Sequence, residues 1–391
     1  MKKLGLLPKL IIAIILGIII GSVGPKWSVQ TLATFNGLFG NFLSFTIPLI
    51  IVGFVAPGIG ELGEKAGKLL GITALIAYVS TIFSGSLAYF TSSVVLPRIL
   101  AGESLNVDAV NPEEALLEPF FTVEMPPIFG VMTALLIAFT IGLGIAAVKS
   151  EAIKKVMQEF QAIIEKLISK IIIPLLPFHI LGIFANMTHA GQVVTILSVF
   201  SRVFIMVILL HLTVLVIQFI VGGTFAGGNP FRLLKNMIPA YLTAIGTQSS
   251  AATIPVTLAQ TKKNGVQDEV AEFVVPLCAT IHLSGSTITL VSCSIAIMML
   301  NNMPVSFASM FPFILMLGIT MVAAPGVPGG AVMAALGILE SMLGFPQALL
   351  SLMIALYVAQ DSFGTATNIT GDGAIALLVN KISGYKLNKQ A

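Results

Sequence analysis

Charged residues are scarce in this chain of 391 residues. Asp, Glu, Lys and Arg make up only 9% of it, whereas 56% of the residues are hydrophobic and the mean hydropathy is +1.01. Soluble domains carry roughly 25% charged residues, and no soluble fold can hide this much apolar surface. The composition therefore excludes a soluble protein and predicts a polytopic membrane protein, with membrane lipid as its surroundings.

Several functional motifs are also missing. The two cysteines, Cys278 and Cys293, lie in one apolar segment, and their separation matches neither a zinc site nor a disulfide framework. No nucleotide-binding loop is visible, so primary pumping by ATP has no support. The net charge of +3 gives no reason to expect a nucleic-acid partner, because the charges lie in loops between apolar runs. We also expect no organic cofactor.

The apolar runs predict an all-α protein with eight transmembrane helices. These spans cover residues 7–23, 35–55, 69–96, 128–148, 167–187, 194–221, 266–300 and 345–379. The N-terminus resembles a signal peptide, but no small-residue cleavage site follows it, so we keep it as the first span. Two regions interrupted by Gly, Pro and Ser, at 229–260 and 302–343, alternate with the last two spans.

The positions of Lys and Arg indicate how the interrupted regions lie in the membrane. If both regions enter and return to their own side, and the N-terminus is cytoplasmic, all 20 of these residues except Lys26, Arg98 and Arg202 fall on the cytoplasmic side. This is the asymmetry of the positive-inside rule, and a simple crossing at either region would destroy it. We therefore predict two re-entrant helical hairpins, cytoplasmic N- and C-termini, and a multi-pass protein of the cell inner (plasma) membrane.

Helix-breaking residues cluster at four places in the second half of the chain. The first hairpin should break at Gln248–Ser250, and the prolines and glycines of 323–333 forbid a continuous helix in the second. Further breaks are expected at 279–287 and 366–372, in the last two spans. Non-helical backbone at membrane depth is tolerated only beside protein or water. A hairpin followed by a broken span, occurring twice, is the inverted-repeat pattern of secondary transporters.

The eighth span carries two carboxylates in a hydrophobic run. Asp361, Thr365, Asn368 and Asp372 are spaced by four, three and four residues, which keeps the last three within about 40° of Asp361 on one helix face. A carboxylate at membrane depth costs several kcal/mol and normally faces a cavity, a cation or a partner. An intramembrane enzyme with an aspartate pair is excluded, because the helical rise separates Asp361 and Asp372 by about 16 Å. A passive channel is a further function class, but two hairpin tips that close on one pocket are better suited to enclosing a substrate than to forming an open pore.

At these residues the chain resembles the dicarboxylate/amino-acid:cation symporters, which share the glutamate-transporter fold. The shared features are the serine-rich first tip, the seventh-span break, the second tip and the eighth-span pattern, represented by Ser249, Ser250, Thr253, Pro255, Gly326–Gly329, Asp361, Thr365, Asn368, Gly371 and Asp372. The resemblance implies an elevator-type transporter, a homotrimer, and no enzyme. Residues 1–62 and 99–190 would form a static scaffold, and residues 63–98 and 191–391 a moving transport domain.

The resemblance also implies which residues bind an amino-acid substrate. Asp361 would hold the α-amino group, and Thr365 and Asn368 would form further hydrogen bonds with the substrate. The two hairpin tips would bind the α-carboxylate through side chains and backbone amides of Gln248, Ser249, Ser250, Gly326, Val327, Pro328 and Gly329.

Two positions depart from the pattern of family members that carry acidic substrates. Gly364 stands where those members have an arginine, and Gln248 stands where some have an arginine at the first tip. With no cation in the pocket, a second substrate carboxylate would be buried unpaired at a cost of several kcal/mol. The run 361–368 is more similar to the serine/threonine branch. We therefore expect a serine-, threonine- or alanine-like substrate, with a larger neutral amino acid, another zwitterion or a dicarboxylate as alternatives.

A site for the coupling ion is implied around Asp372. By the resemblance, its ligands come from Asp372, Asn368, Cys278, His282, Thr280 and Ser284. The family motif in the seventh span has an aspartate where this chain has Ser284, and its loss indicates at least one fewer sodium site. His282 is titratable and offers proton coupling as an alternative; otherwise we expect a neutral imidazole bonded to a backbone carbonyl. The carboxylate of Asp372 favours sodium.

Polar residues in the other spans have less support as binding residues. Tyr78, Ser80 and Thr81 lie where the family places oxygen ligands for a further sodium ion, but the seventh-span aspartate that would share this ion is missing. His179 and His211 are single residues in apolar spans. We expect both to be packing residues.

Overall fold

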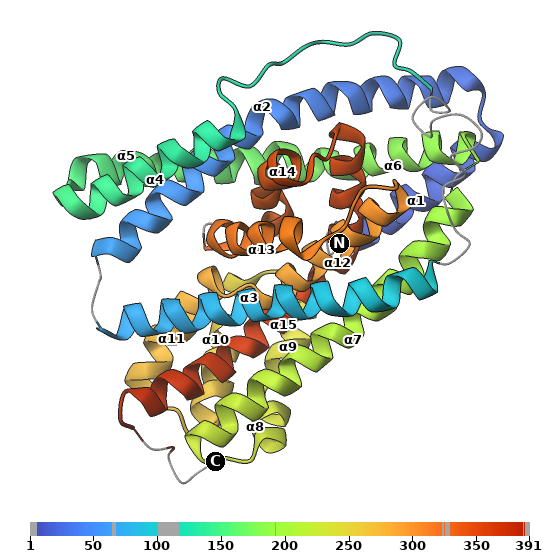
Figure 1. Ribbon diagram of the computed structural model, residues 1–391. Coiled ribbons are helices and arrows are strands. Elements are labelled where there is room, and N and C mark those ends of the chain that lie inside the picture. The colour runs from blue at the N-terminus through green and yellow to red at the C-terminus, as the bar shows by residue number, and fades with distance from the viewer. Residues whose placement is uncertain are drawn as a thin grey trace, which may run out of the picture.

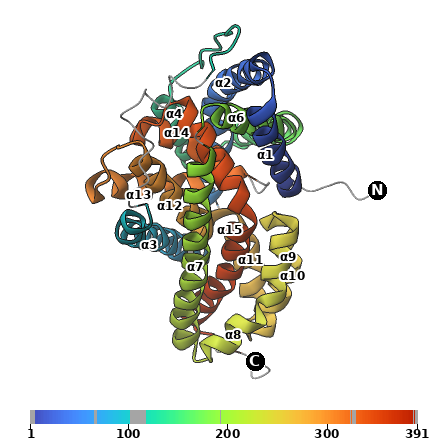
Figure 2. The same cartoon turned by 90° about the vertical axis from the view of Figure 1, so that its right-hand side faces the viewer.

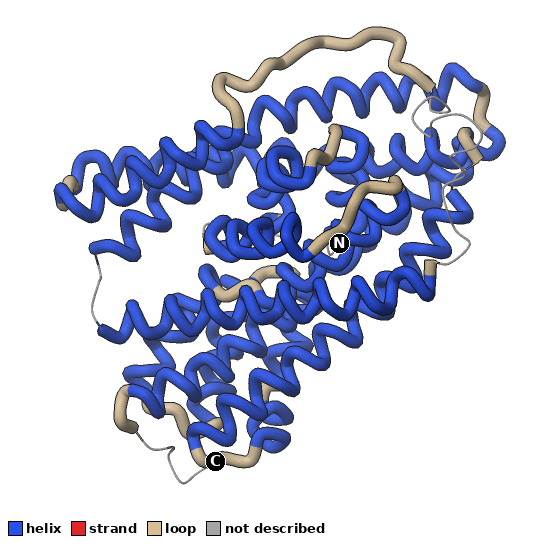
Figure 3. The backbone as a smooth tube through the Cα atoms, viewed as in Figure 1, coloured by secondary structure: helices blue, strands red, loops and turns tan. Residues whose placement is uncertain are grey.

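The computed structural model describes residues 6–64, 68–100, 117–191, 193–322, 324, 329–385 and 387, and every regular element in these ranges is a helix, as predicted (Figure 3). Six helical segments are long and apolar enough to cross a membrane: Lys26–Pro57, Leu69–Ile99, Glu151–His189, Leu197–Ala226, Asp268–Leu300 and Gln347–Ile382. The predicted first and fourth spans correspond to the shorter apolar helices Pro8–Val23 and Leu136–Val148. The count of eight spans therefore stays a prediction.

One group of helices packs around α2. It consists of α1 (Leu6–Val23), α2 (Lys26–Glu64), α4 (Val131–Val148), α5 (Glu151–Leu167), the π-helical turn η1 (Ile168–Ile172) and α6 (Ile173–His189). Helix α2 contacts α4, α5 and α6, while α1 contacts α6. These helices lie together in the upper part of Figure 1. The fifth predicted span is thus the second half of a longer helix that begins at Glu151.

A second group packs around the last helix. It contains α3 (Lys68–Ile99), α7 (Val193–Ala226), α11 (Asp268–Ile281), α12 (Ser284–Leu300) and α15 (Gln347–Ile382). Helix α15 contacts α7, α11 and α12, and α3 covers α12 (Figures 1 and 2). The two groups meet where α6 contacts α7 and α15, and where α1 contacts α15. The division into a static scaffold and a moving transport domain stays a prediction.

Two helical hairpins complete the fold. After the short α8 (Pro230–Asn236), α9 (Ile238–Thr247) and α10 (Ser250–Lys263) pack against each other, as do α13 (Phe307–Met321) and α14 (Gly330–Leu343). The first hairpin breaks where predicted, because Gln248 takes a left-handed conformation with φ +52° and the Ser249 side chain accepts a hydrogen bond from Ala252 N. In the second tip, Gly326, Val327 and Pro328 lie outside the described residues.

Of the two breaks predicted in the last spans, one is confirmed and the other is wrong. The seventh span ends its first helix at Ile281 and begins its second at Ser284, whereas α15 runs unbroken through 366–372. The glycines of α15 make room for neighbours instead of ending the helix. A Cβ on Gly371 would lie 2.6 Å from Gln218 Oε1, and one on Gly373 would lie 2.8 Å from Met237 Cε.

Glycine also governs the crossing of α12 and α15. A Cβ on Gly285 would lie 2.5 Å from the carbonyl oxygen of Gly364 and 2.6 Å from Thr367 Cβ. Any side chain at this position would force the two helices apart, since interiors are close-packed. Gly285 therefore allows the start of α12 to rest directly on the middle of α15.

Candidate functional site

A small cavity lies where the two hairpins, the α11–α12 break and α15 converge. Its volume is about 20 Å³, room for about one water molecule, and it is lined by Gln248, Ser250, Ala279, Leu283, Ser286, Ala324, Ala331, Tyr357, Asp361, Thr365 and Asn368. Three of the four residues in the predicted stripe on α15 line this cavity together with residues of the first tip, whereas the fourth, Asp372, does not. No lysine, arginine or histidine is among the described residues that line it. The one charged side chain in this described lining is Asp361.

Asp361 connects α15 to the second hairpin. Its Oδ2 accepts a hydrogen bond of 2.7 Å from the backbone N of Gly329. Gly329 directly precedes α14 and has a φ of +75°, so the carboxylate lies at the N-terminus of that helix. An acceptor and a negative charge at this position satisfy a free amide and interact favourably with the helix dipole. Asp361 thus both lines the cavity and bonds the N-terminus of α14.

Asn368 connects α15 to the second half of the seventh span. Its Oδ1 accepts hydrogen bonds from Gly285 N (2.8 Å) and Ser286 N (3.3 Å), and its Nδ2 donates to Ser286 Oγ (3.0 Å). The residue at the start of α12, Leu283, supplies no side-chain cap. Asn368 therefore caps α12 from another helix, a structural role that the sequence pattern did not reveal.

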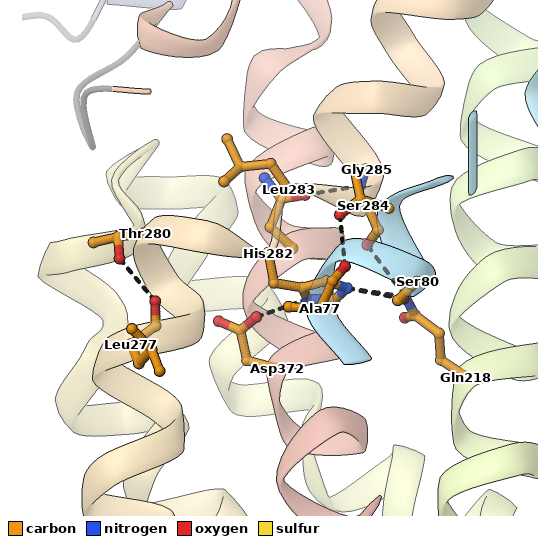
Figure 4. A network of polar contacts seen from close by, with 12 residues as sticks. Ala77, Ser80, Gln218, Leu277, Thr280, His282, Leu283, Ser284, Gly285 and Asp372 are labelled. Atoms are coloured by element: carbon orange, nitrogen blue, oxygen red, sulfur yellow. Dashed lines mark hydrogen bonds and ion pairs between the residues drawn. The ribbon is translucent and has the colours of Figure 1, made fainter. Parts of the chain in front are cut away.

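Asp372 belongs to a buried polar network, shown in Figure 4. Its Oδ1 lies 2.9 Å from His282 Nδ1, and His282 Nε2 lies 3.0 Å from Ser80 Oγ. Gln218 on α7 donates from Nε2 to Ser80 Oγ (3.0 Å) and to Ser284 Oγ (3.2 Å). The network thus joins α3, α7, α15 and the α11–α12 break. The expectation that His282 bonds a backbone carbonyl is wrong, because its two ring nitrogens contact a carboxylate and a hydroxyl.

Two acceptor oxygens of this network have no hydrogen-bond partner within the described part of the chain. They are Asp372 Oδ2 and Gln218 Oε1, and both are buried. A buried acceptor without a donor is costly, and more so when it is charged. Oxygen atoms of this kind are the ligands that hard cations prefer. The arrangement is therefore suited to a small alkali cation beside Asp372.

The other predicted cation ligands are placed differently. The carbonyl oxygen of Cys278 accepts the backbone N–H of His282 at 2.8 Å. Thr280 is exposed, and its hydroxyl bonds to Leu277 O of its own helix, away from Asp372 in Figure 4. No group of three or more His, Cys, Asp or Glu side chains that could hold a metal ion occurs among the described residues. This donor set does not resemble a transition-metal site.

Two further predicted substrate residues lie beside the cavity without lining it. Ser249 caps α10 through its side chain, and the adjacent Ser250 lines the cavity. A Cβ on Gly364 would lie 3.5 Å from Ser286 N and 3.7 Å from the carbonyl carbon of Gly285, and thus point to the start of α12. Gly364 is therefore a helix-crossing position, next to the polar residues that form the cavity wall.

Sequence reasoning missed part of the cavity wall. The residues not foreseen as lining are Ala279, Leu283, Ser286, Ala324, Ala331 and Tyr357. Tyr357 lies one helical turn before Asp361, so the helical periodicity that revealed the stripe would have included it. Ser286 is the last residue of the seventh-span motif. The small and apolar residues left no signal in a single sequence.

The two isolated histidines have buried partners. His179 Nδ1 lies 3.1 Å from Asn36 Oδ1, and its Nε2 lies 3.1 Å from Ser351 Oγ. His211 Nε2 lies 2.9 Å from the carbonyl oxygen of Gly285. Neither lines the cavity or joins the Asp372 network, which agrees with the expectation of packing roles.

Comparison with known proteins gives one family and a consistent set of relatives. The model of the sodium:dicarboxylate symporter family matches residues 6–382. A serine/threonine transporter SstT from Streptococcus suis is 26% identical over 85% of this chain and 94% of its own length. A protein of the same name from Acinetobacter baumannii is 28% identical over 95% of each chain. A proton/sodium-glutamate symport protein from Bacillus caldotenax is 26% identical over 98% of this chain and 96% of its own length.

Proposed function

The chain belongs to the sodium:dicarboxylate symporter family, and on this premise we propose that it takes up a small neutral amino acid together with sodium. The family and its relatives are secondary transporters and not enzymes. With its apolar helices, the chain is a multi-pass membrane protein of this kind. The substrate class, the coupling ion and the movement of the transport domain are our proposals beyond the family assignment.

One observation carries the substrate assignment: a cavity with a carboxylate and no cationic side chain among its described lining residues. An amino acid presents an ammonium group, which pairs with the carboxylate of Asp361. Its α-carboxylate would lie near Ser250, at the N-terminus of α10, where free backbone amides and the helix dipole favour an anion. A substrate side chain with a second carboxylate would be buried without a partner, at a cost of several kcal/mol. A serine-, threonine- or alanine-like side chain avoids that cost.

The second observation concerns closure of the cavity. Gly329 N donates to the same carboxylate that we assign to the substrate ammonium. Arrival of the ammonium group would therefore change the contact between α15 and the second hairpin. This link supports a role for the second tip, including Gly326, Val327 and Pro328, in closing over the substrate.

Sodium is our proposal for the coupling ion, with Asp372 as its charged ligand. The buried Oδ2 of Asp372 lacks a donor in the described residues, and Ser284 and Gln218 supply neutral oxygen atoms in the same network. Proton coupling is the second candidate, favoured by the 2.9 Å contact between His282 Nδ1 and Asp372 Oδ1. A relative described as a proton/sodium-glutamate symport protein makes both ions worth testing.

We further propose an elevator mechanism in a homotrimer. The helices packed around α2 (residues 1–62 and 99–190) would remain fixed, and those packed around α15 (residues 63–98 and 191–391) would move. The packing of α3 and α7 against the α12–α15 pair supports this division. Cytoplasmic N- and C-termini in the cell membrane follow from the distribution of Lys and Arg.

The decisive experiment is uptake of labelled L-serine into proteoliposomes containing the purified protein. An inward sodium gradient and an inward proton gradient are imposed separately. Unlabelled serine, threonine, alanine, leucine, glutamate, aspartate and succinate compete in parallel. We expect sodium-driven uptake that is blocked by small neutral amino acids and unaffected by aspartate or succinate.

Each other result points to a defined alternative. Uptake that is independent of sodium and driven by the proton gradient identifies the proton as the coupling ion. Competition by dicarboxylates alone refutes the neutral-substrate proposal. Asp268→Asn serves as a matched carboxylate control for Asp361→Asn, because Asp268 is an exposed residue paired with Lys262 outside the cavity.

A further inference from the structure

The shape of the cavity depends largely on one side chain. Among the described lining residues, Tyr357 is the only aromatic one, and half of the others are alanine or serine: Ala279, Ala324, Ala331, Ser250 and Ser286. Tyr357 is 1% exposed, and in the described part of the chain it is the largest fully buried side chain. Tyr357 is therefore the bulkiest side chain in the described lining of the cavity.

The ring is held in place by hydrogen bonds at its tip. Tyr357 Oη donates to Ser286 Oγ at 2.8 Å, and Ser286 Oγ also accepts a bond from Asn368 Nδ2 at 3.0 Å. Asn368 is itself fixed by the backbone N atoms of Gly285 and Ser286. A buried tyrosine with a satisfied hydroxyl adopts one orientation, because turning the ring would leave a buried polar group unpaired. Tyr357 is thus a rigid part of the cavity wall.

Tyr357 also stands next to the carboxylate assigned to the substrate ammonium. It precedes Asp361 by one helical turn, so both side chains project from the same face of α15. An amino acid whose ammonium group is held at Asp361 has its Cα within a few ångströms of the ring. A side chain that extends from this Cα meets the phenol or must pass beside it.

We propose that Tyr357 is the residue that limits the size of the substrate side chain. This inference rests on the proposed uptake of neutral amino acids and adds the determinant of selectivity within that class. The ring face allows the small side chains of alanine, serine and threonine and excludes larger ones. The hydroxyl contributes by fixing the ring, since it donates to Ser286 Oγ and also contacts the Asp361 carboxylate.

Variants at Tyr357 separate the volume of the ring from its hydroxyl. Tyr357→Ala vacates roughly the space of a benzene ring, and Tyr357→Leu vacates part of it while keeping an apolar side chain. Tyr357→Phe keeps the ring and removes its hydrogen bond to Ser286 Oγ. Tyr89→Leu is the matched control, because Tyr89 is a buried tyrosine on α3 that packs against Phe90 and Phe307, outside the cavity.

The measurement is the concentration of unlabelled leucine, methionine and serine that halves uptake of labelled serine. In Tyr357→Ala and Tyr357→Leu, we expect the leucine-to-serine ratio of these concentrations to fall by at least about ten-fold, since each accommodated methylene group is worth roughly ten-fold or more in selectivity. In Tyr357→Phe and Tyr89→Leu, this ratio should stay within about three-fold of the wild type. Ligand-induced shifts in Tm of the purified variants give the same ratio where transport is too slow to measure.

The outcomes distinguish this inference from the function on which it rests. An unchanged ratio in both Tyr357→Leu and Tyr357→Ala, with folded protein, overturns the size-limiting role and leaves serine uptake intact. An equal change in Tyr357→Phe overturns it too, because the hydroxyl and not the ring would then set selectivity. If the wild-type protein binds only dicarboxylates, the proposed uptake of neutral amino acids is refuted, and the role of Tyr357 that depends on it is refuted as well.

Discussion

Removal of the Asn368 side chain tests the role that the structure assigns to it. In Asn368→Ala, Gly285 N and Ser286 N lose their shared acceptor at the start of α12, and Ser286 Oγ loses a donor. A buried backbone donor without a partner costs about 1–3 kcal/mol, and loss of an N-cap costs typically about 1 kcal/mol. The longer contact of 3.3 Å to Ser286 N contributes less than the one of 2.8 Å to Gly285 N. We expect a destabilisation of about 2–4 kcal/mol.

Thermal unfolding of the purified protein in detergent measures this effect as a lowered Tm. Ser286→Ala removes the hydroxyl that accepts hydrogen bonds from Asn368 Nδ2 and Tyr357 Oη and leaves the cap, so it should cost about 1–2 kcal/mol. Asn301→Ala is the second control, because Asn301 Nδ2 bonds only Ile297 O at the end of its own helix. If Asn368→Ala lowers the Tm no more than these two controls, α12 does not depend on Asn368 for its cap, and the reasoning is refuted.

Three further predictions concern the site itself. Asp361→Asn keeps an acceptor for Gly329 N but removes the charge, so binding of amine-bearing substrates should weaken by about 10–100-fold; near-normal affinity in a binding assay would remove the amino-acid assignment. Asp372→Asn should raise the sodium concentration needed for half-maximal uptake by roughly ten-fold or more, and an unchanged sodium dependence would move the cation site elsewhere. Gly371→Ala places a Cβ 2.6 Å from Gln218 Oε1 and 2.9 Å from His282 Cε1, so it should impair sodium-dependent uptake through the network; full activity would show that these side chains move aside at no cost.

The parts of the fold that the sequence predicted well are those with a periodic or compositional signal. Long apolar runs marked the spanning helices, and the left-handed turn at Gln248 followed from a polar, serine-rich tip. The spacing of Asp361, Thr365 and Asn368 correctly placed three side chains at one cavity. Local chemistry was sufficient in these cases because the deciding interactions lie within a few residues of each other.

The errors arose where a distant partner decides the outcome. Gly371 and the polar residues around it look like a helix break, yet α15 continues because Gln218 and His282 fill the space left by the glycine. The partners of Asn368 and His282 come from residues 82 to 202 positions away in the chain. No single-sequence pattern reports such pairs. Tyr357 was overlooked for a different reason, since a tyrosine in an apolar helix resembles ordinary core.

The glycine contact between α12 and α15 has a consequence for any working cycle. With the backbone of Gly285 seated directly against Gly364 O and Thr367, the two helices interlock, and neither can slide along the other without first separating. The cavity and the Asp372 network both draw residues from these two helices. In the elevator mechanism that we propose, substrate and ion would therefore move together on a single rigid body, with a constant distance between their sites.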